Sequence, residues 1–209
     1  ISATGRRAAL GHGPFVVEAD ESDGSFLQYP AQIVVVTNIE ADHLDNWGTA
    51  VAYEEGFVTL GSAPDVSTVI MNADEPRSRE VAAQLRERGK TVITVGEGAD
   101  ADIRISDVQL GPGLTAATLS ADGDTGPLTL MVPGRFNLTN AAAAYAVGRA
   151  LDLPGPQVRE ALGRFAGTYR RFEFRGEADG VRVFDDYAHH PTEVAAILTA
   201  AREDRKSVV

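Results

Sequence analysis

Two segments that carry acidic and histidine side chains each follow a short apolar run. Glu18 comes directly after residues 15–17, and His43 comes shortly after residues 33–36. Such runs are typical of strands buried on both faces of a parallel sheet, and ligands bind at the carboxyl ends of these strands. A carboxylate and an imidazole that meet there can hold a divalent cation. We predict this role for Glu18 and His43; the alternative is that both only cap strand ends.

A second group of titratable side chains lies within residues 185–191. Asp185, Asp186, His189 and His190 follow another apolar run and precede Pro191. Carboxylates and imidazoles so close together could ligate a metal, transfer protons or bind a nucleotide. In the alternative, Asp185 caps a turn while His190 and Pro191 only begin a helix.

Two further sites could bind anions. The adjacent arginines Arg170 and Arg171 stand out in an acidic chain, and guanidinium groups suit phosphate oxygens, although they could also pair with surface acids. Asn137 and Asn140 lie at the expected start of an alanine-rich helix, where free backbone N–H groups favour an anion or a purine edge. Either asparagine could instead be the N-cap.

The composition narrows the class of protein. The 209 residues carry a formal net charge of −11, so nucleic acid is a poor partner for the chain. Cysteine is absent, which excludes disulfides and cysteine-ligated metal sites. We find no apolar stretch of membrane-spanning length and no secretory signal. The chain does not begin with methionine, and we expect it to be a fragment.

The elements that must position these residues follow an α/β pattern. Strands at residues 66–71 and 91–95 flank a helix at 78–88, which predicts a βαβ unit. Residues 103–110, 114–120 and 128–132 predict an antiparallel meander. We expect further helices at 47–60, 137–151 and 156–165, a hairpin of 172–177 with 181–185, and a helix at 191–205 with Val194, Ile197 and Leu198 inward. One domain then covers residues 1–167, and a truncated second domain covers 168–209.

Four blocks, in this order along the chain, resemble the Mur ligase family. They are residues 18–26, 37–43, 170–173 and 185–193. The resemblance implies the central P-loop-type ATPase domain of that family, with a mostly parallel sheet and a small antiparallel meander, followed by the first part of a Rossmann-like C-terminal domain. The glycine-rich phosphate loop and the N-terminal domain of the family would lie outside this sequence. Gly89-Lys90-Thr91 is no substitute, because it ends a helix and opens a strand.

The resemblance also implies the roles of individual residues. Phe136 departs from the pattern, since a histidine is usual there. The implied roles are Mg²⁺ ligands for Glu18 and His43, contacts to ATP phosphates for Arg171, and nucleotide contacts for Asn137, Asn140, Asp186 and His189, with Glu18, His43 and Arg171 as the catalytic set.

The implied activity is ATP-dependent ligation in the bacterial cytoplasm, as a step of peptidoglycan precursor synthesis. It joins L-alanine to the carboxylate of UDP-N-acetylmuramate through an acyl phosphate. The lack of lysine between His43 and Lys90 favours this branch over the later Mur ligases, several of which carry a modified lysine there. Ser22 and Tyr187 favour it over the recycling ligase that adds a whole tripeptide. Two alternatives are a non-catalytic nucleotide- or sugar-binding module and a metal-dependent hydrolase built on residues 185–190. We expect the 209-residue chain alone to bind ATP weakly and to be inactive.

Overall fold

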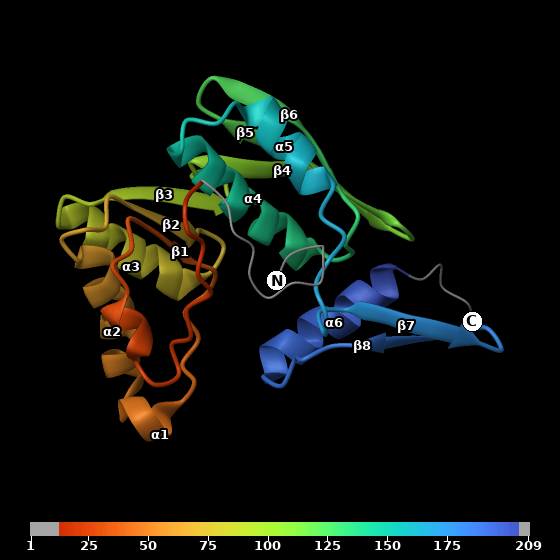
Figure 1. Cartoon of the computed structure of the whole chain (residues 1–209), viewed down its shortest axis with the longest axis horizontal. Helices are drawn as coiled ribbons and strands as arrows, with labels where there is room; N and C mark the ends of the chain where they lie inside the picture. The colour runs from red at the N-terminus through yellow and green to blue at the C-terminus, as the bar shows by residue number, and fades with distance from the viewer. Residues whose placement is uncertain (1–12, 205–209) are drawn as a thin grey trace.

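The structure is a computed structural model that describes residues 13–204 (Figure 1). Its main feature is a six-stranded sheet whose strands lie in chain order. The strands are β1 (Ile33–Val36), β2 (Thr68–Asn72), β3 (Thr91–Gly96), β4 (Ile103–Gly111), β5 (Leu114–Ala121) and β6 (Asp124–Leu130). Strands β1 to β4 pair in parallel, and β4, β5 and β6 pair antiparallel. The predicted α/β sheet with an antiparallel meander is therefore confirmed, and both parts belong to one sheet.

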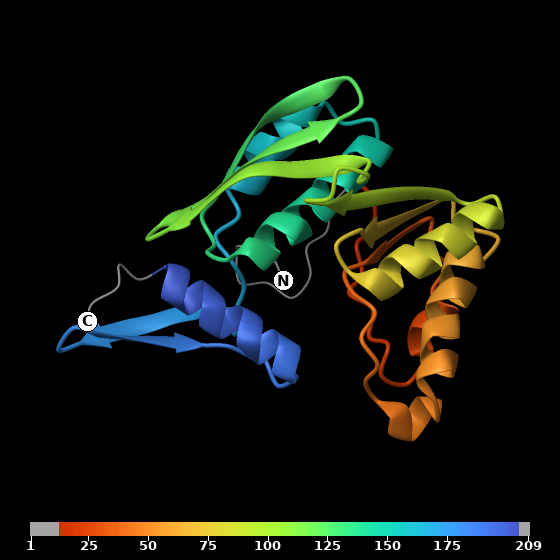
Figure 2. The same cartoon turned by 180° about the vertical axis from the view of Figure 1, so that it is seen from behind.

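Helices cover both faces of this sheet. Helices α2 and α3 lie on one face of β1 to β3, while α4 crosses the other face (Figure 1, and from behind in Figure 2). The helices here are α1 (Leu44–Trp47), α2 (Ala50–Ser62), α3 (Pro76–Glu87), α4 (Arg135–Ala150) and α5 (Gly155–Gly163), with a short 3₁₀ helix at Ser25–Gln28. No helix among residues 13–204 is both long and apolar enough to cross a membrane.

The βαβ unit shows how local sequence sets these elements. Helix α3 begins where the Glu75 side chain accepts hydrogen bonds from the backbone N–H groups of Arg77 and Ser78, and Pro76 stands in its first turn. Gly89, with a φ of 78°, follows the helix and allows the chain to turn into β3. The predicted helix and its glycine stop are confirmed.

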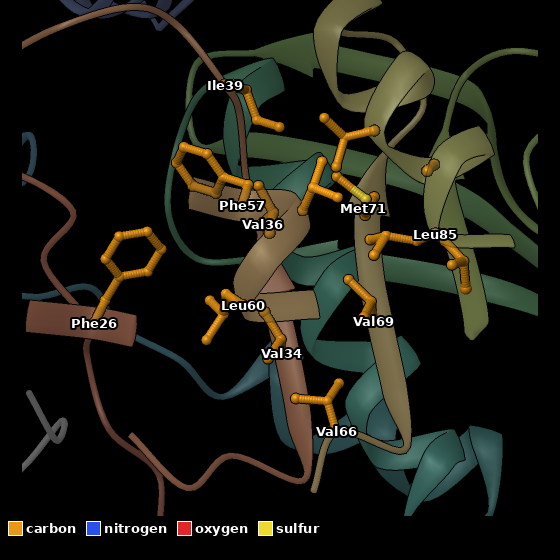
Figure 3. Close-up of a cluster of buried hydrophobic side chains, with 14 of the residues drawn as sticks. Phe26, Val34, Val36, Ile39, Phe57, Leu60, Val66, Val69, Met71 and Leu85 are labelled. Atoms are coloured by element: carbon orange, nitrogen blue, oxygen red, sulfur yellow. The ribbon is translucent and has the colours of Figure 1, made fainter. Parts of the chain in front are cut away.

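Strand β2 is buried on both faces, as its continuous apolar run predicts. Val69 and Met71 pack in a cluster with residues of α2 and α3, whereas Ile70 packs in a second cluster with α4. Figure 3 shows the first cluster, where Met71 lies among side chains of the neighbouring elements. Strand β1 differs: it is the edge of the sheet, and Val35 is 41% exposed. Burial of both faces is therefore a wrong prediction for β1.

Two predicted elements in the first half need correction. Residues 15–17 form no strand, and Phe15 is 93% exposed. A strand needs a hydrogen-bonded neighbour, and no described residue pairs with this run. The helix predicted at 47–60 is confirmed as α2, but it begins only at Ala50, because Gly48, with a φ of 75°, ends the preceding helix α1. Thr49 then caps α2, because its side chain accepts a hydrogen bond from the Ala52 N–H.

The C-terminal part is a hairpin followed by a helix, next to but separate from the large sheet (Figure 1). Strands β7 (Glu173–Ala178) and β8 (Val181–Asp185) are joined by Asp179 and Gly180, both with positive φ, as a two-residue hairpin turn requires. Helix α6 (Pro191–Glu203) follows. The predicted inward face of α6 is wrong for Val194 and Leu198, which are exposed. The buried position is Ala200, beside Gly134 at the start of α4.

Candidate functional site

The segment that follows His43 holds the acidic loop that follows Glu18. The Trp47 indole N–H donates to the carbonyl of Glu21 at 2.9 Å. The Asn46 side chain donates to the carbonyl of Ser22 at 3.0 Å. These contacts join segments that are 26 and 24 residues apart in sequence. The structure therefore brings the two predicted metal-binding segments side by side.

Carboxylates next to His43 make this region anionic. Asp42 accepts a hydrogen bond from the His43 backbone N–H at 2.7 Å, which lowers the pKa of Asp42. The pKa of Asp20 is lowered mainly by hydrogen bonds from Ser22, and to a smaller extent by His43. Both carboxylates are therefore charged at neutral pH, which favours a cation here.

The donor set of Glu18 and His43 suits a cation that arrives with its own oxygen ligands. Among residues 13–204, no three His, Asp or Glu side chains gather in a way that could hold a metal. Mg²⁺ commonly takes one or two protein ligands and completes its shell with water and substrate phosphates. The Glu18 carboxylate is a ligand of that kind, and the His43 imidazole would add a second protein ligand. The joint binding of one ion by Glu18 and His43 stays a prediction.

Arg171 lines two clefts at once. One cleft, of about 440 Å³, is lined by Glu18, Arg170, Arg171 and Tyr187 together with Thr168 and Tyr169. The other, of about 530 Å³, includes Asn137 and Arg171 in its lining. The predicted phosphate-binding arginine therefore stands between a predicted metal ligand and a predicted nucleotide contact.

The alternative that Asn137 or Asn140 is the N-cap of α4 is wrong. Gly134 is the N-cap residue, with a φ of 99° and no side-chain cap, so neither Asn137 nor Asn140 has that role. The Asn137 amide donates to the Pro133 carbonyl at 2.7 Å, and the Asn140 side chain is exposed. Phe136, at the position where the resemblance implies a histidine, packs its ring against Gly134.

The titratable side chains of residues 185–191 do not form one cluster, because each contacts a different part of the structure. Both carboxylate oxygens of Asp186 accept backbone N–H groups, from Phe172 and from Ala188, each at 2.7 Å. The His189 ring packs edge-on against Tyr187, with 5.2 Å between ring centroids. His190 is the N-cap of α6, which confirms the structural alternative for that residue. The nucleotide contacts predicted for Asp186 and His189 stay predictions.

Sequence reasoning assigned no role to Glu40, yet Glu40 joins the first part of the chain to α6. Its carboxylate accepts a hydrogen bond from the Thr192 hydroxyl at 2.7 Å and lies 3.6 Å from the ring Nδ1 of His190. The partners are 152 residues apart. The one sequence signal for this contact was that Glu40 and Thr192 lie in two of the four blocks that resemble the Mur ligase family, residues 37–43 and 185–193.

Comparisons with known proteins agree with this arrangement. The Mur ligase middle domain matches residues 6–148, and the Mur ligase glutamate ligase domain matches residues 170–209. The UDP-N-acetylmuramate–L-alanine ligase of Cutibacterium acnes is 53% identical over 204 residues, which are 97% of this chain and 43% of that protein. The enzyme of the same name from Kineococcus radiotolerans is 50% identical over 194 residues, which are 92% of this chain and 41% of that protein.

A solved structure gives the same result in three dimensions. The UDP-N-acetylmuramate–alanine ligase of Thermotoga maritima matches with a TM-score of 0.79 and 28% identity, over 94% of this chain and 44% of that chain. The present chain thus spans less than half the length of these relatives. Because the middle-domain match alone covers more than half of its residues, the chain belongs to the Mur ligase family.

Proposed function

We propose that this chain works within an ATP-dependent ligase that joins L-alanine to the carboxylate of UDP-N-acetylmuramate. The observation that carries the proposal is the position of Arg171 between the cleft of Glu18 and the cleft of Asn137. Relatives that are about half identical and bear the name of this activity support it. We also propose a domain boundary at residues 167/168, just before the Arg171 segment, and a cytoplasmic location where ATP is available.

The chemistry requires activation of a carboxylate. Its negative charge repels an incoming amine, so transfer of the ATP γ-phosphoryl group first makes an acyl phosphate, and the amine of L-alanine then displaces phosphate. Negative charge on the phosphoryl oxygens must be neutralised and held in place during transfer. The Arg171 guanidinium would bind these oxygens, and Asn137 and Asn140 would bind the nucleotide.

Glu18 and His43 would hold a Mg²⁺ ion. The ion supplies positive charge at the phosphate oxygens when it is bound. The charged carboxylates of Asp20, in the acidic loop, and of Asp42, next to His43, favour such a cation.

The residues that favour the L-alanine branch lie at this site. Tyr187 lines the cleft of Glu18, and the Ser22 carbonyl is the acceptor for Asn46. The hydrolase alternative loses support, because both Asp186 oxygens bind backbone N–H groups and the described residues hold no three-ligand metal cluster.

The test is an amino-acid-dependent ATPase assay on the protein expressed from its whole coding sequence. With UDP-N-acetylmuramate present, we expect L-alanine to stimulate phosphate release and to form UDP-N-acetylmuramoyl-L-alanine, identified by mass spectrometry. Stimulation by the tripeptide instead would assign the recycling activity. ATP or UDP-sugar binding without turnover under any amino acid would assign the non-catalytic module.

A further inference from the structure

Arg171 sits between two residues with unusual backbone conformations. Arg170 has a φ of 57° and Phe172 a φ of 50°, in the left-handed region that residues with a Cβ rarely adopt. Neither residue is glycine, asparagine or aspartate, the types that visit this region most readily. Such backbone strain persists where surrounding contacts fix it, and it tends to occur at functional sites.

The contacts that fix this bend come from the residues just after β8 and from the start of β7. The Phe172 N–H donates to the Asp186 carboxylate at 2.7 Å, and the Tyr187 N–H donates to the Arg170 carbonyl at 2.8 Å. At the start of β7, the Glu173 carboxylate accepts a hydrogen bond from the Arg170 N–H at 2.9 Å. The Arg170 guanidinium lies over the Tyr187 ring, 4.5 Å from its centroid. The bend is therefore held on both sides of Arg171.

Asp186 is suited to this task because it is a pure acceptor. Its second oxygen accepts the Ala188 N–H at 2.7 Å, so one carboxylate joins the bend to the segment that leads into α6. Charge-assisted hydrogen bonds of this kind are stronger than neutral ones. An asparagine amide in the same place would point its NH₂ group at one of the two backbone N–H groups, and two donors cannot form a hydrogen bond.

We propose that Asp186 is a positioning residue for Arg171: its carboxylate holds the strained bend so that Arg171 lines both clefts. The proposal rests on the proposed function, in which Arg171 binds the transferred phosphoryl group. It differs from the nucleotide contact that the family resemblance implies, because Asp186 acts through the backbone of its neighbour.

A double-mutant cycle on the protein from the whole coding sequence tests this role. Asp186→Asn should lower kcat about 100-fold, as a small misplacement of a catalytic group does. Arg171→Ala should lower kcat by about 100-fold or more, as loss of one electrostatic contact to the transition state does. In the Arg171→Ala background, Asp186→Asn should change kcat by no more than about twofold, since its effect passes through the missing side chain.

Asp179→Asn is the matched control. It makes the same chemical change in the turn between β7 and β8, where Asp179 is exposed and its φ of 52° suits asparagine as well as aspartate. We expect kcat within about twofold of the unmodified protein. A loss caused by misfolding or by a direct nucleotide contact would appear as the same factor in both Arg171 backgrounds, and that additive result would overturn the proposal. An unchanged kcat in Asp186→Asn would also overturn it.

Hydrogen exchange measures the anchor itself and needs neither activity nor a folded variant. In the unmodified protein, the Phe172 amide should exchange at least about tenfold more slowly than in an unstructured peptide, because it is hydrogen-bonded. Exchange of the Phe172 amide at the peptide rate would overturn the proposal. Absence of L-alanine-dependent turnover in the unmodified protein would reject the proposed function, while the exchange result would still decide on the anchor.

Discussion

Replacing Asp124 by asparagine should destabilise the protein in a pH-dependent way. The Asp124 carboxylate, at the start of β6, accepts hydrogen bonds from the Arg159 guanidinium of α5 and the Tyr145 hydroxyl of α4. The Asp124 and Arg159 side chains are 16% and 9% exposed, so the pair is largely removed from water. The hydrogen bonds from Arg159, and then from Tyr145, lower the pKa of Asp124 from 3.8 to about 2.

The size of the effect follows from this pKa. A lowering from 3.8 to about 2 corresponds to about 2.5 kcal/mol in favour of the charged carboxylate in the folded state. Because the folded pKa is lowered, this stability is fully present above pH 3.8 and is lost as the pH falls through about 2. At pH 7 the variant also leaves the Arg159 charge without its partner, and breaking a buried pair costs about 3 to 5 kcal/mol. We therefore expect a loss of about 2.5 to 4 kcal/mol at neutral pH.

Urea unfolding of the 209-residue chain measures this loss. Trp47, the one tryptophan of the sequence, is the fluorescence probe. The difference between Asp124→Asn and the unmodified chain should shrink steadily between pH 4 and pH 2. Glu160→Gln is the control on the same helix, because the exposed pair of Glu160 and Arg164 is worth less than about 0.5 kcal/mol. A loss at pH 7 below 1 kcal/mol, roughly the value of a surface pair, or an equal loss at pH 2 and pH 7, would refute this reasoning.

Three further predictions concern the site. Glu18→Ala and His43→Ala should each lower turnover about 100-fold, by removing a ligand of the phosphate-bound cation, and near-normal turnover at saturating magnesium would reject the assignment. Glu40→Ala should lower kcat about tenfold by breaking the hydrogen bond to the start of α6; steady-state kinetics equal to those of the unmodified protein would contradict the contact. Trp47→Phe should keep the ring packing but lose the hydrogen bond to the Glu21 carbonyl, which costs about 1 kcal/mol in urea unfolding followed by circular dichroism, because this variant lacks the tryptophan probe. A Trp47→Phe protein as stable as the original would show that this bond does not hold the loop.

Much of the fold can be predicted because local and global signals agree in it. The apolar run of β2 is buried on both faces, and α3 has an N-cap, a proline in its first turn and a glycine stop. Residues 15–17 have the same local pattern as β2 but no paired neighbour among the described residues, so the same reasoning fails there. Whether an apolar run becomes a buried strand depends on the strands and helices beside it, and three residues of sequence carry no information about those neighbours.

The site is less predictable because its key contacts are distant in sequence or made by the backbone. The hydrogen bond between Glu40 and Thr192 spans 152 residues, and no local pattern points to it. The left-handed φ values at Arg170 and Phe172 involve residue types that give no such signal. Asp186 was predicted to be a site residue from its chemistry, but its backbone partners are visible only in three dimensions.

The measurement that tests the central claim most directly is electron paramagnetic resonance of Mn²⁺ bound to the protein from the whole coding sequence. The ion is added with a non-hydrolysable ATP analogue and UDP-N-acetylmuramate. The account predicts a hyperfine coupling from one imidazole nitrogen, which disappears in His43→Ala and persists in His189→Ala, together with weaker Mn²⁺ binding in Glu18→Ala. A nitrogen coupling that survives His43→Ala, or Mn²⁺ affinity unchanged by Glu18→Ala, would contradict it.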